Sequence, residues 1–388
     1  MNTKKKIIIS AGGTGGHIYP AIAVAQALQK RLNNEVEFLF VGASDRMEME
    51  KVPKAGFKIV GLWISGLQRR ITYKNILFPF KVISSIVKSF GIINNFKPDA
   101  VIGFGGYASS AVLYAASLKK LPTLIHEQNS YAGITNKILK DKVNKICVAY
   151  DNMEKFFPAN KLVKTGNPIR QDLMDVTRKR SEAIEFFKLD SNKKTVLVLG
   201  GSLGARTINE SVFEGLEKLK AANINLIWQT GKNFSKINSN KDPDKSGLNS
   251  KKSANSSENN SSLEFRISNF QIREFIYEMD LAYAAADVVI SRAGALSIAE
   301  LAQVAKPVIL VPSPNVAEDH QTKNAMALVN KNAAILVKDI DARNNLITET
   351  LNLVNDSNKQ AELVKNIRTF AMPNAAELIV DEVIKLMK

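Results

Sequence analysis

A single cysteine, Cys147, occurs among the 388 residues, so the chain cannot form an intramolecular disulfide. It lies in the apolar run KICVAY, a pattern that predicts a buried strand position and fits a reducing compartment. Apolar runs never approach the ~20 residues that a bilayer-spanning helix needs, and the first is too short for a secretory signal. These shortages exclude a disulfide scaffold and a spanning segment, and they favour a soluble or peripheral cytoplasmic protein.

Acidic residues are also few. The chain has 37 of them against 53 lysines and arginines, which gives a formal charge of +16. A basic chain suits an anionic partner, such as a nucleotide, a nucleic acid or an anionic membrane, although a lysine-rich genome produces the same excess. Hydrophobic residues make up 45% and charged residues 23%, which is typical of globular proteins and excludes a mostly disordered chain. The length predicts two or three domains of roughly 150 residues each.

Short apolar runs alternate with amphipathic segments of helix length, which is typical of parallel βαβ units. Because the runs are continuously apolar, both faces of each sheet should be covered, as in a doubly wound α/β fold. We expect helices over 21–31, 108–118 and 361–388, with a mostly helical segment over 171–193. Strands are predicted at residues 6–10, 36–41, 99–103, 122–126, 145–149, 195–201, 224–228, 287–291 and 306–311.

The alternation restarts after the TGNPIR segment at 165–170, and each half opens with a strand, a glycine-rich turn and a helix. This repetition predicts two Rossmann-like domains that face each other across a cleft. The expected domains are 1–166 and 167–370, followed by a C-terminal helix over 371–388 that can pack back on the first domain. Residues 235–262, rich in serine, asparagine and lysine, have too few apolar side chains for a core and are predicted to form a mobile surface loop.

Two glycine-rich turns, at 12–16 and 200–206, each follow a predicted strand and precede a predicted helix. Glycines there allow a positive φ and a close backbone approach, and the helix N-terminus behind them attracts an anion. The first turn is not a dinucleotide fingerprint, because Ile18 stands at the third glycine position, and it lacks the Gly-Lys-Ser/Thr of a P-loop. Each turn therefore predicts a phosphate or sugar site, against the alternative of a tight turn without a ligand.

Polar side chains also follow three predicted strands, at 126–129, 291–297 and 314–321. The carboxyl ends of parallel strands meet at one edge of a sheet, where ligands of doubly wound folds bind. Ordinary alternatives remain for single residues. His126 can be a core histidine bonded to the backbone, and Glu300 can be a first-turn carboxylate favoured by the helix dipole.

The segments AGGTGGHIYPAIAVA, GFGGYAS, HEQNS, TGNPIR, GGSLGA, SRAGALSIAE and EDHQTKNA occur in this order. Together they resemble the MurG family of N-acetylglucosaminyltransferases, which convert lipid I to lipid II in bacterial peptidoglycan synthesis. The resemblance implies a GT-B fold, an inverting reaction, and neither a metal nor a cofactor in the active site. This sequence departs from the family in a long segment before Phe275 and in Ser130, where glycine is common.

For the donor, UDP-GlcNAc, the resemblance implies a site in the second domain. Ser202 with Arg170 would meet the diphosphate, and Ile276 would bond uracil through its backbone. Glu300 would take the ribose hydroxyls, and Gln321 would bind the GlcNAc hydroxyls. The remaining donor residues implied by the resemblance are Thr14, Gly15, Gly16, Asn129, Ala295, Leu296, Ser297, Ile298 and Ala299.

For the acceptor, undecaprenyl-pyrophosphoryl-MurNAc-pentapeptide, the resemblance implies that the MurNAc C4 hydroxyl attacks C1 of GlcNAc and UDP leaves. Its diphosphate would bind at Gly12, Gly13, Gly105 and Gly106, and nucleic acid is not an expected partner. His17 is the candidate general base, although binding a phosphate or capping the turn explains it equally well. Two other functions stay open, a UDP-GlcNAc 2-epimerase of the same fold and a non-catalytic nucleotide-binding module, although glycine turns in both halves argue against the latter.

A lipid-linked acceptor requires a peripheral contact with the cytoplasmic face of the bacterial cell membrane, an anionic surface. Segment 67–93 is the candidate, because Pro79 interrupts a long helix and apolar residues lie between Arg69, Arg70, Lys74, Lys81 and Lys88. One group of apolar side chains should be exposed, namely Ile76, Leu77 and Phe80. A second group should be buried against the first sheet, namely Ile83, Ile86 and Val87.

Overall fold

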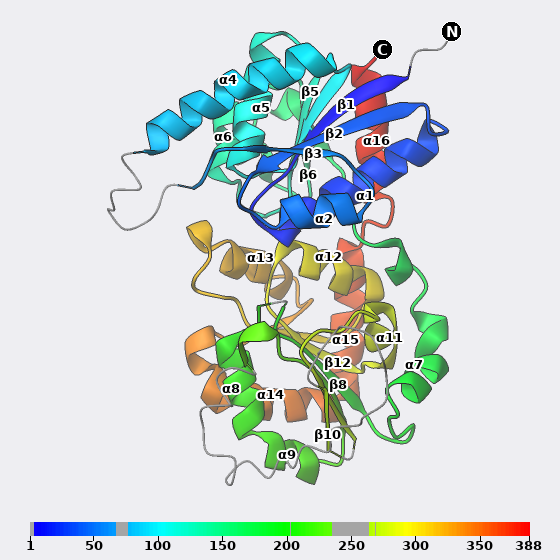
Figure 1. Ribbon diagram of the computed structural model, residues 1–388. Coiled ribbons are helices and arrows are strands. Elements are labelled where there is room, and N and C mark those ends of the chain that lie inside the picture. Colours follow the sequence, from blue (N-terminus) through cyan, green and yellow to red (C-terminus); the bar gives the residue numbers. More distant parts are fainter. Residues whose placement is uncertain (1–3, 67–76, 202, 235–263, 268) are drawn as a thin grey trace. The chain divides into compact units, whose positions relative to one another are not determined.

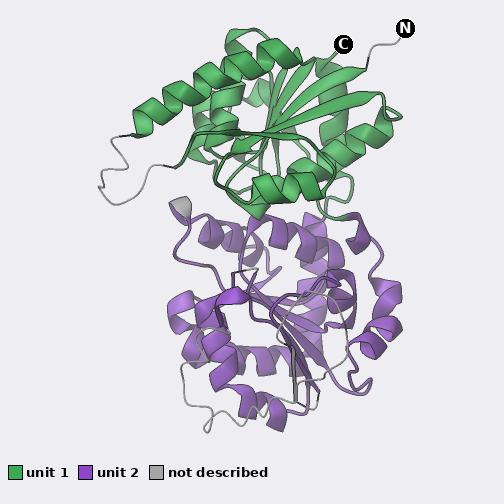
Figure 2. Ribbon diagram, in the orientation of Figure 1, with its two compact units in different colours: residues 1–170, 372–388 green, residues 171–371 purple. Residues whose placement is uncertain are grey.

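The computed structural model describes residues 4–66, 77–201, 203–234, 264–267 and 269–388. The chain divides into two units, residues 1–170 with 372–388 and residues 171–371 (Figure 2). Helix α16 (Ala375–Leu386) therefore belongs to the first unit, where it contacts α1 (Gly15–Arg31). Ser202, residues 67–76 and the serine-rich segment 235–262 lie outside the described residues, so the predictions made for them are not tested.

The first unit contains a seven-stranded parallel sheet in the order β3-β2-β1-β4-β5-β6-β7 (Figure 1). All strands predicted in this half are present, and the short strands β3 and β7 were not predicted. The strands are β1 (Lys5–Ser10), β2 (Val36–Ala43), β3 (Ile59–Leu62), β4 (Ala100–Gly103), β5 (Thr123–Glu127), β6 (Lys145–Val148) and β7 (Leu162–Lys164). The helices are α1, α2 (Glu48–Lys54), α4 (Phe78–Phe96), α5 (Tyr107–Leu118), α6 (Ile134–Leu139) and α16, with 3-10 turns at Met153–Lys155 and Ala159–Lys161.

Side chains that alternate along β1 supply the cores on both faces of this sheet. Ile7 and Ile9 pack in a cluster with residues of α1 and α16, whereas Ile8 packs in a second cluster with residues of α5 and α6. Cys147 is fully buried in β6, as predicted, and burial raises the pKa of its thiol. Helices therefore cover both faces, as the continuously apolar strands indicated.

The second unit contains a seven-stranded sheet in the order β10-β11-β9-β8-β12-β13-β14, in which β10 pairs antiparallel with β11. The strands are β8 (Thr195–Leu199), β9 (Asn225–Gln229), β10 (Glu264–Ile267), β11 (Phe270–Arg273), β12 (Val288–Ser291), β13 (Val308–Leu310) and β14 (Ile335–Leu336). The helices are α7 (Arg180–Phe186), α8 (Arg206–Glu214), α9 (Leu216–Ala221), α11 (Met279–Ala285), α12 (Ala295–Val304), α13 (His320–Val329), α14 (Ala342–Asn355) and α15 (Ser357–Ile367). Single 3-10 turns occupy Gln171–Leu173, Thr177–Lys179, Ala317–Asp319, Asp339–Asp341 and Arg368–Phe370.

Two helical predictions were too long. Segment 171–193 contains only α7 and two 3-10 turns, because its charged residues lack a sustained apolar face. Segment 361–388 is split between α15, which ends at Ile367, and α16, which begins at Ala375. Pro373 lies in the break, where its missing N–H and fixed φ oppose a continuous helix.

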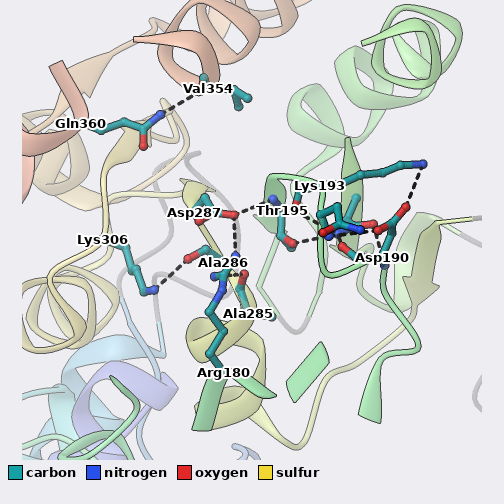
Figure 3. Close-up of polar contacts among 12 residues, drawn as sticks. Arg180, Asp190, Lys193, Thr195, Ala285, Ala286, Asp287, Lys306, Val354 and Gln360 are labelled. Atoms are coloured by element: carbon teal, nitrogen blue, oxygen red, sulfur yellow. Dashed lines mark hydrogen bonds and ion pairs between the residues drawn. The ribbon is translucent and has the colours of Figure 1, made fainter. Parts of the chain in front are cut away.

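A polar cluster at the amino ends of the second sheet fastens α7 to the strands (Figure 3). The Asp287 carboxylate accepts hydrogen bonds from the Thr195 amide at 2.8 Å and from the Arg180 guanidinium at 3.1 Å. Lys306 donates to the Ala286 carbonyl at 2.8 Å, and burial lowers the pKa of its ammonium group. Because parallel strands place their carboxyl ends at the opposite edge, this cluster supports the fold and lies away from the expected ligand loops.

The burial pattern of α4 differs from the prediction. Leu77 and Phe80 are exposed, as predicted, with Phe80 at 63%. Ile83 and Val87, however, are 61% and 65% exposed, and Ile86 is only partly buried. The prediction of burial is therefore wrong for Ile83 and Val87, whereas Ile86 packs against the core of the first unit.

The buried residues of α4 are Ile93 and two small polar residues, Ser85 and Ser89. Ser85 and Ser89 are fully buried, and their hydroxyls donate to the carbonyls of Trp63 at 3.2 Å and Ser85 at 2.7 Å. Bonded in this way, a serine is buried at little cost and lets the helix lie close to α5, which it contacts. Pro79 occupies the first turn and begins the helix instead of interrupting it, since an N–H is not needed there. Within the described ranges, no helix is long and apolar enough to cross a bilayer.

Candidate functional site

Both sheets reverse their strand order beside the first strand of the unit. In the first unit β1 lies between β2 and β4, and in the second β8 lies between β9 and β12. Ligands of open α/β sheets bind outside the carboxyl ends of the strands at such a switch point. The loops that follow β1, β4, β8 and β12 are therefore the candidate binding loops, and most of the predicted site residues lie in them.

The loop after β1 presents backbone N–H groups at the start of α1. Thr14 is the extended N-cap residue, and its carbonyl accepts a hydrogen bond from the His17 amide at 3.1 Å. Gly13 has a φ of +88°, and a Cβ added there would meet no atom within 4 Å, so the loop is open on this side. Gly15 and Gly16 begin a 17-residue helix whose N-terminus favours an anion.

A second glycine turn, after β4, packs directly on the first. Gly105 and Gly106 have φ values of +98° and +88°. A Cβ on Gly106 would lie 2.6 Å from the Gly12 carbonyl oxygen, and one on Gly105 would lie 2.9 Å from Cε1 of His17. A side chain at either position would separate the turns. The structure thus brings together the glycines predicted for the acceptor diphosphate and His17, whereas their role in binding stays a prediction.

Glu48 is a fully buried carboxylate that sequence analysis did not identify. Its Oε2 accepts a hydrogen bond from the Gly13 amide at 3.1 Å, and its Oε1 accepts one from the Ala43 amide at 2.9 Å. A Cβ on Gly12 would lie 2.8 Å from Oε1, so a side chain here would displace the carboxylate from its present position. Glu48 therefore fastens the first glycine turn to the end of β2. Glu48 is the first residue of the short helix α2, and no recognisable sequence motif marks this position.

Three polar side chains of the first unit form a hydrogen-bonded chain behind the glycine turns. Nδ1 of His17 lies 3.1 Å from Oε1 of Gln128, and Nε2 of Gln128 lies 3.1 Å from Nδ1 of His126. His126 is fully buried and its Nε2 lies 2.8 Å from the Gly166 carbonyl oxygen, which confirms its interpretation as a core histidine bonded to the backbone. Burial lowers the pKa of His17 and lowers that of His126 to about 4.

Asn129 is held by the buried carboxylate of Glu127. One carboxylate oxygen accepts hydrogen bonds from the Asn129 amide at 3.0 Å and from its Nδ2 at 3.2 Å. The other accepts from the Gly133 amide at 2.9 Å and from Nδ2 of Asn136 at 2.8 Å. Glu127 therefore fixes the loop between β5 and α6. Sequence analysis placed this loop at a strand end but did not assign a role to Glu127.

The glycine loop of the second unit is anchored on one side and open on the other. A Cβ on Gly204, whose φ is +87°, would lie 2.5 Å from the Thr230 carbonyl oxygen, so the loop lies tightly against the end of β9. Asn209 of α8 donates to the same carbonyl at 2.7 Å. Gly201 has a φ of +76° and no atom within 4 Å of an added Cβ. Ser202, the next residue in the sequence, lies outside the described residues, and Arg170 is partly buried at the end of the first unit.

Helix α12 supplies the next group of predicted donor residues. Gly294 is an extended N-cap residue, so the amides that follow it, from Ala295, Leu296 and Ser297, are the helix N-terminus. Ile298 is buried in the core and therefore offers only its backbone. Glu300 is the sixth residue of the helix, which excludes its interpretation as a first-turn carboxylate. The Tyr283 hydroxyl donates to its Oε2 at 3.3 Å and orients it.

Two other residues predicted to bind the donor, Ile276 and Gln321, have backbone or side-chain amide groups that already have partners. Ile276 has a fully buried side chain, and its N–H donates to Oε1 of Gln229 at 3.1 Å, so the predicted contact with uracil would have to use its carbonyl. Gln321 accepts a hydrogen bond from the Ser313 amide at 2.9 Å, which orients its side-chain amide at the start of α13. Among the described residues, no group of three or more His, Cys, Asp or Glu side chains is arranged to hold a metal ion.

Comparison with known proteins identifies the family. Residues 7–148 match the glycosyltransferase family 28 N-terminal domain, and residues 195–379 match the C-terminal domain of the same family. The chain belongs to glycosyltransferase family 28. Over 385 residues it is 55% identical to the UDP-N-acetylglucosamine–N-acetylmuramyl-(pentapeptide) pyrophosphoryl-undecaprenol N-acetylglucosamine transferase of Flavobacterium psychrophilum, covering 99% of this chain and 98% of that protein. The N-terminal match lies within the first structural unit, and the C-terminal match covers most of the second unit and continues to residue 379, within α16 of the first unit.

Solved structures support the same assignment of fold. The MurG of Acinetobacter baumannii superposes on this chain with a TM-score of 0.73 and 27% sequence identity, covering 98% of this chain and 99% of that one. A UDP-GlcNAc 2-epimerase from Neisseria meningitidis has a TM-score of 0.64 at 17% identity, covering 98% of this chain and 100% of that one. The second likeness shows a shared fold alone. The predicted GT-B architecture of this family 28 protein is thus confirmed.

Proposed function

We propose that this protein transfers GlcNAc from UDP-GlcNAc to the MurNAc C4 hydroxyl of undecaprenyl-pyrophosphoryl-MurNAc-pentapeptide, with inversion at C1. The observation that carries the proposal is the 55% identity, along 99% of the chain, to a protein named for this transfer. The glycine loops support it, since each unit has an open, anion-attracting loop at its switch point. A transfer between two diphosphate-bearing substrates needs two such loops.

The second unit is proposed to bind the donor. Amides of Ala295, Leu296 and Ser297, Ser202 and Arg170 would stabilise the negative charge that develops on the departing diphosphate. Glu300, held by Tyr283, would accept hydrogen bonds from the ribose hydroxyls. The Ile276 carbonyl would accept from uracil, and the oriented amide of Gln321 would bind the GlcNAc hydroxyls. Thr14, Gly15, Gly16 and Asn129 of the first unit would contact the sugar.

The first unit is proposed to bind and activate the acceptor. The paired glycine turns would bind its diphosphate, with Glu48 holding Gly13 in position. In the transfer step the C4 oxygen bonds to C1 of GlcNAc, the bond from C1 to the UDP oxygen breaks, and the C4 proton passes to His17. Burial keeps the pKa of His17 low and the ring neutral near pH 7, which is the state that a base requires.

Helix α4 is proposed to contact the cytoplasmic face of the membrane, where the lipid-linked acceptor resides. Phe80, Ile83 and Val87 are three-fifths or more exposed and are spaced three and four residues apart, so they lie along one helix face. Lys88 is exposed beside them, and Lys81 lies 5.5 Å from the centre of the exposed Trp63 ring. Exposed apolar side chains next to lysines suit an interface with anionic lipid.

A UDP-release assay with and without a lipid I analogue tests the proposed reaction. The transferase releases UDP only when the acceptor is present, and the product contains GlcNAc bonded to C4 of MurNAc. A 2-epimerase instead interconverts two UDP-sugars without an acceptor. Acceptor-independent conversion of UDP-GlcNAc to a second UDP-sugar, without transfer, would overturn the proposal.

A further inference from the structure

Two backbone carbonyls contact the hydrogen-bonded chain His17–Gln128–His126, that of Gly166 at His126 and that of Phe104 at Gln128, and they determine the direction of its hydrogen bonds. A carbonyl oxygen only accepts, so Nε2 of His126, 2.8 Å from the Gly166 oxygen, must carry a proton. A neutral imidazole has one N–H, which leaves a lone pair on Nδ1 of His126. The pKa of His126, lowered to about 4 by burial, keeps this ring neutral at physiological pH.

Gln128 is oriented by the same reasoning. Its side-chain nitrogen lies 3.1 Å from Nδ1 of His126 and 2.9 Å from the Phe104 carbonyl oxygen, and both partners are acceptors. Only the NH₂ group of the amide satisfies both, so the assignment of oxygen and nitrogen in this side chain follows from the network. The amide oxygen must then face His17, and Nδ1 of His17, at 3.1 Å, must donate to it.

We infer that Gln128 is a positioning residue that holds His17 in the tautomer with the proton on Nδ1 and the lone pair on Nε2. This inference rests on the proposed function, in which His17 receives the acceptor proton. With Nδ1 protonated, Nε2 is the atom that accepts the proton from the C4 hydroxyl. The resulting imidazolium keeps its Nδ1–H on the Gln128 oxygen, so no second proton moves.

An amide behind a catalytic histidine has a different consequence from a carboxylate. A carboxylate bonded to Nδ1 raises the basicity of the ring, whereas a neutral amide fixes the tautomer with little added charge. Burial has the largest effect on the pKa of His17 and lowers it, whereas Glu127, the Gln128 hydrogen bond, the Phe104 carbonyl and Glu48 each raise it by less. The neighbouring His126 is neutral and adds no charge. Gln128 therefore orients the ring while burial keeps it unprotonated.

The tautomers are measurable without activity. The chain has three histidines, so the protein labelled with ¹⁵N-histidine gives three ring systems, which the His17→Ala and His126→Phe variants assign. Long-range ¹H–¹⁵N correlation spectra of the wild type at pH 7.5 should show a protonated Nδ1 in His17 and a protonated Nε2 in His126. In Gln128→Met, which has a similar size but no amide, His17 should become a mixture of tautomers. His320, in the second unit, serves as the internal control and should not change.

Kinetics separate positioning from a merely structural role. Gln128→Met should lower kcat by roughly tenfold or more with the donor KM within about twofold, because the base is then often in the wrong tautomer. Gln128→Glu keeps an oxygen acceptor for Nδ1 and should recover part of kcat. Its carboxylate should also raise the pKa of His17, so the acid limb of kcat should move to higher pH.

Each outcome bears on the inference or on the proposed function. A protonated Nε2 in wild-type His17 would overturn the inference, as would a Gln128→Met spectrum and kcat that match the wild type. If Gln128→Met does not fold, the wild-type spectrum and the pH profile of Gln128→Glu still test whether Gln128 positions His17. The predicted tautomers together with a fully active His17→Ala would instead support the orientation and remove His17 from the proposed reaction.

Discussion

The exposed apolar face of α4 gives the sharpest test of membrane binding. The perturbation is the triple substitution Phe80→Ser, Ile83→Ser and Val87→Ser. Full burial of one such side chain contributes about 1.5–3 kcal/mol, and the fraction still exposed in this structure is 61–65%. Transfer of that fraction from water into the lipid interface therefore contributes about 1–2 kcal/mol per residue, or about 3–6 kcal/mol for the three.

The expected result is a loss of vesicle binding without a loss of folding. At about 1.4 kcal/mol per tenfold, the partition coefficient onto anionic vesicles should fall by roughly 10²- to 10⁴-fold. Because the three side chains already contact water, the free energy of unfolding should change little. The assay is cosedimentation with vesicles at low salt, and activity on a water-soluble acceptor analogue shows that the active site is intact.

A matched control separates this face from general surface hydrophobicity. Ile340, in the second unit, is 87% exposed, so Ile340→Ser removes an equally accessible apolar side chain and should bind vesicles like the wild type. Lys88→Glu should weaken binding by about tenfold at low salt and less at high salt, where the charge is screened. The reasoning is refuted if the triple variant still sediments with the vesicles, or if the wild type does not bind them at all.

Three other substitutions probe the site and the fold. Glu300→Ala should weaken donor binding by roughly 10- to 200-fold, from the loss of about 1.5–3 kcal/mol in charged hydrogen bonds, and an unchanged donor KM would contradict its role. His17→Ala should lower kcat by roughly 10²- to 10⁴-fold; since burial lowers the pKa of His17, the wild-type kcat should decline only below pH 6.5 and the variant should lack this limb. Glu48→Ala removes the carboxylate that accepts hydrogen bonds from the Gly13 and Ala43 amides, so it should lower the free energy of unfolding by about 3 kcal/mol and raise the KM for the acceptor substrate. Glu48→Gln should have an intermediate effect on both. An unchanged KM for the acceptor substrate would show that the loop keeps its position without the carboxylate.

The repeating pattern of strands and glycine turns was sufficient to predict the fold. Continuous apolar runs such as residues 195–199 identify buried parallel strands, because both faces of such a strand need apolar side chains. The strands that escaped prediction, β3, β7, β10, β11 and β14, are only two to four residues long, and all of them except β11 lie at sheet edges. Side chains of edge strands are partly solvated, so they need not be apolar, and the sequence shows little hydrophobic pattern at these positions.

The candidate site was predictable where the backbone itself forms it. Glycine turns that end strands have a local signature, because the positive φ of Gly13 or Gly201 favours glycine in the sequence. Glu48 has no such signature: it acts on Gly13 across 35 positions of sequence, and only the folded sheet brings β2 beside β1. Long-range polar contacts of this kind depend on tertiary structure, so periodicity and motif spacing do not reveal them.

Helix α4 shows why amphipathic pattern alone cannot assign an inward face. If water is the only solvent considered, the apolar side chains of Ile83 and Val87 should be buried against the protein core, and this burial was predicted. The structure instead buries Ser85 and Ser89 together with Ile93, and because the serine hydroxyls donate to backbone carbonyls, their burial costs little. An outward apolar face is unfavourable in water by the same few kcal/mol that the vesicle experiment should recover. A protein retains such a face when another apolar phase covers it, and in the function proposed above that phase is the membrane in which the lipid-linked acceptor resides.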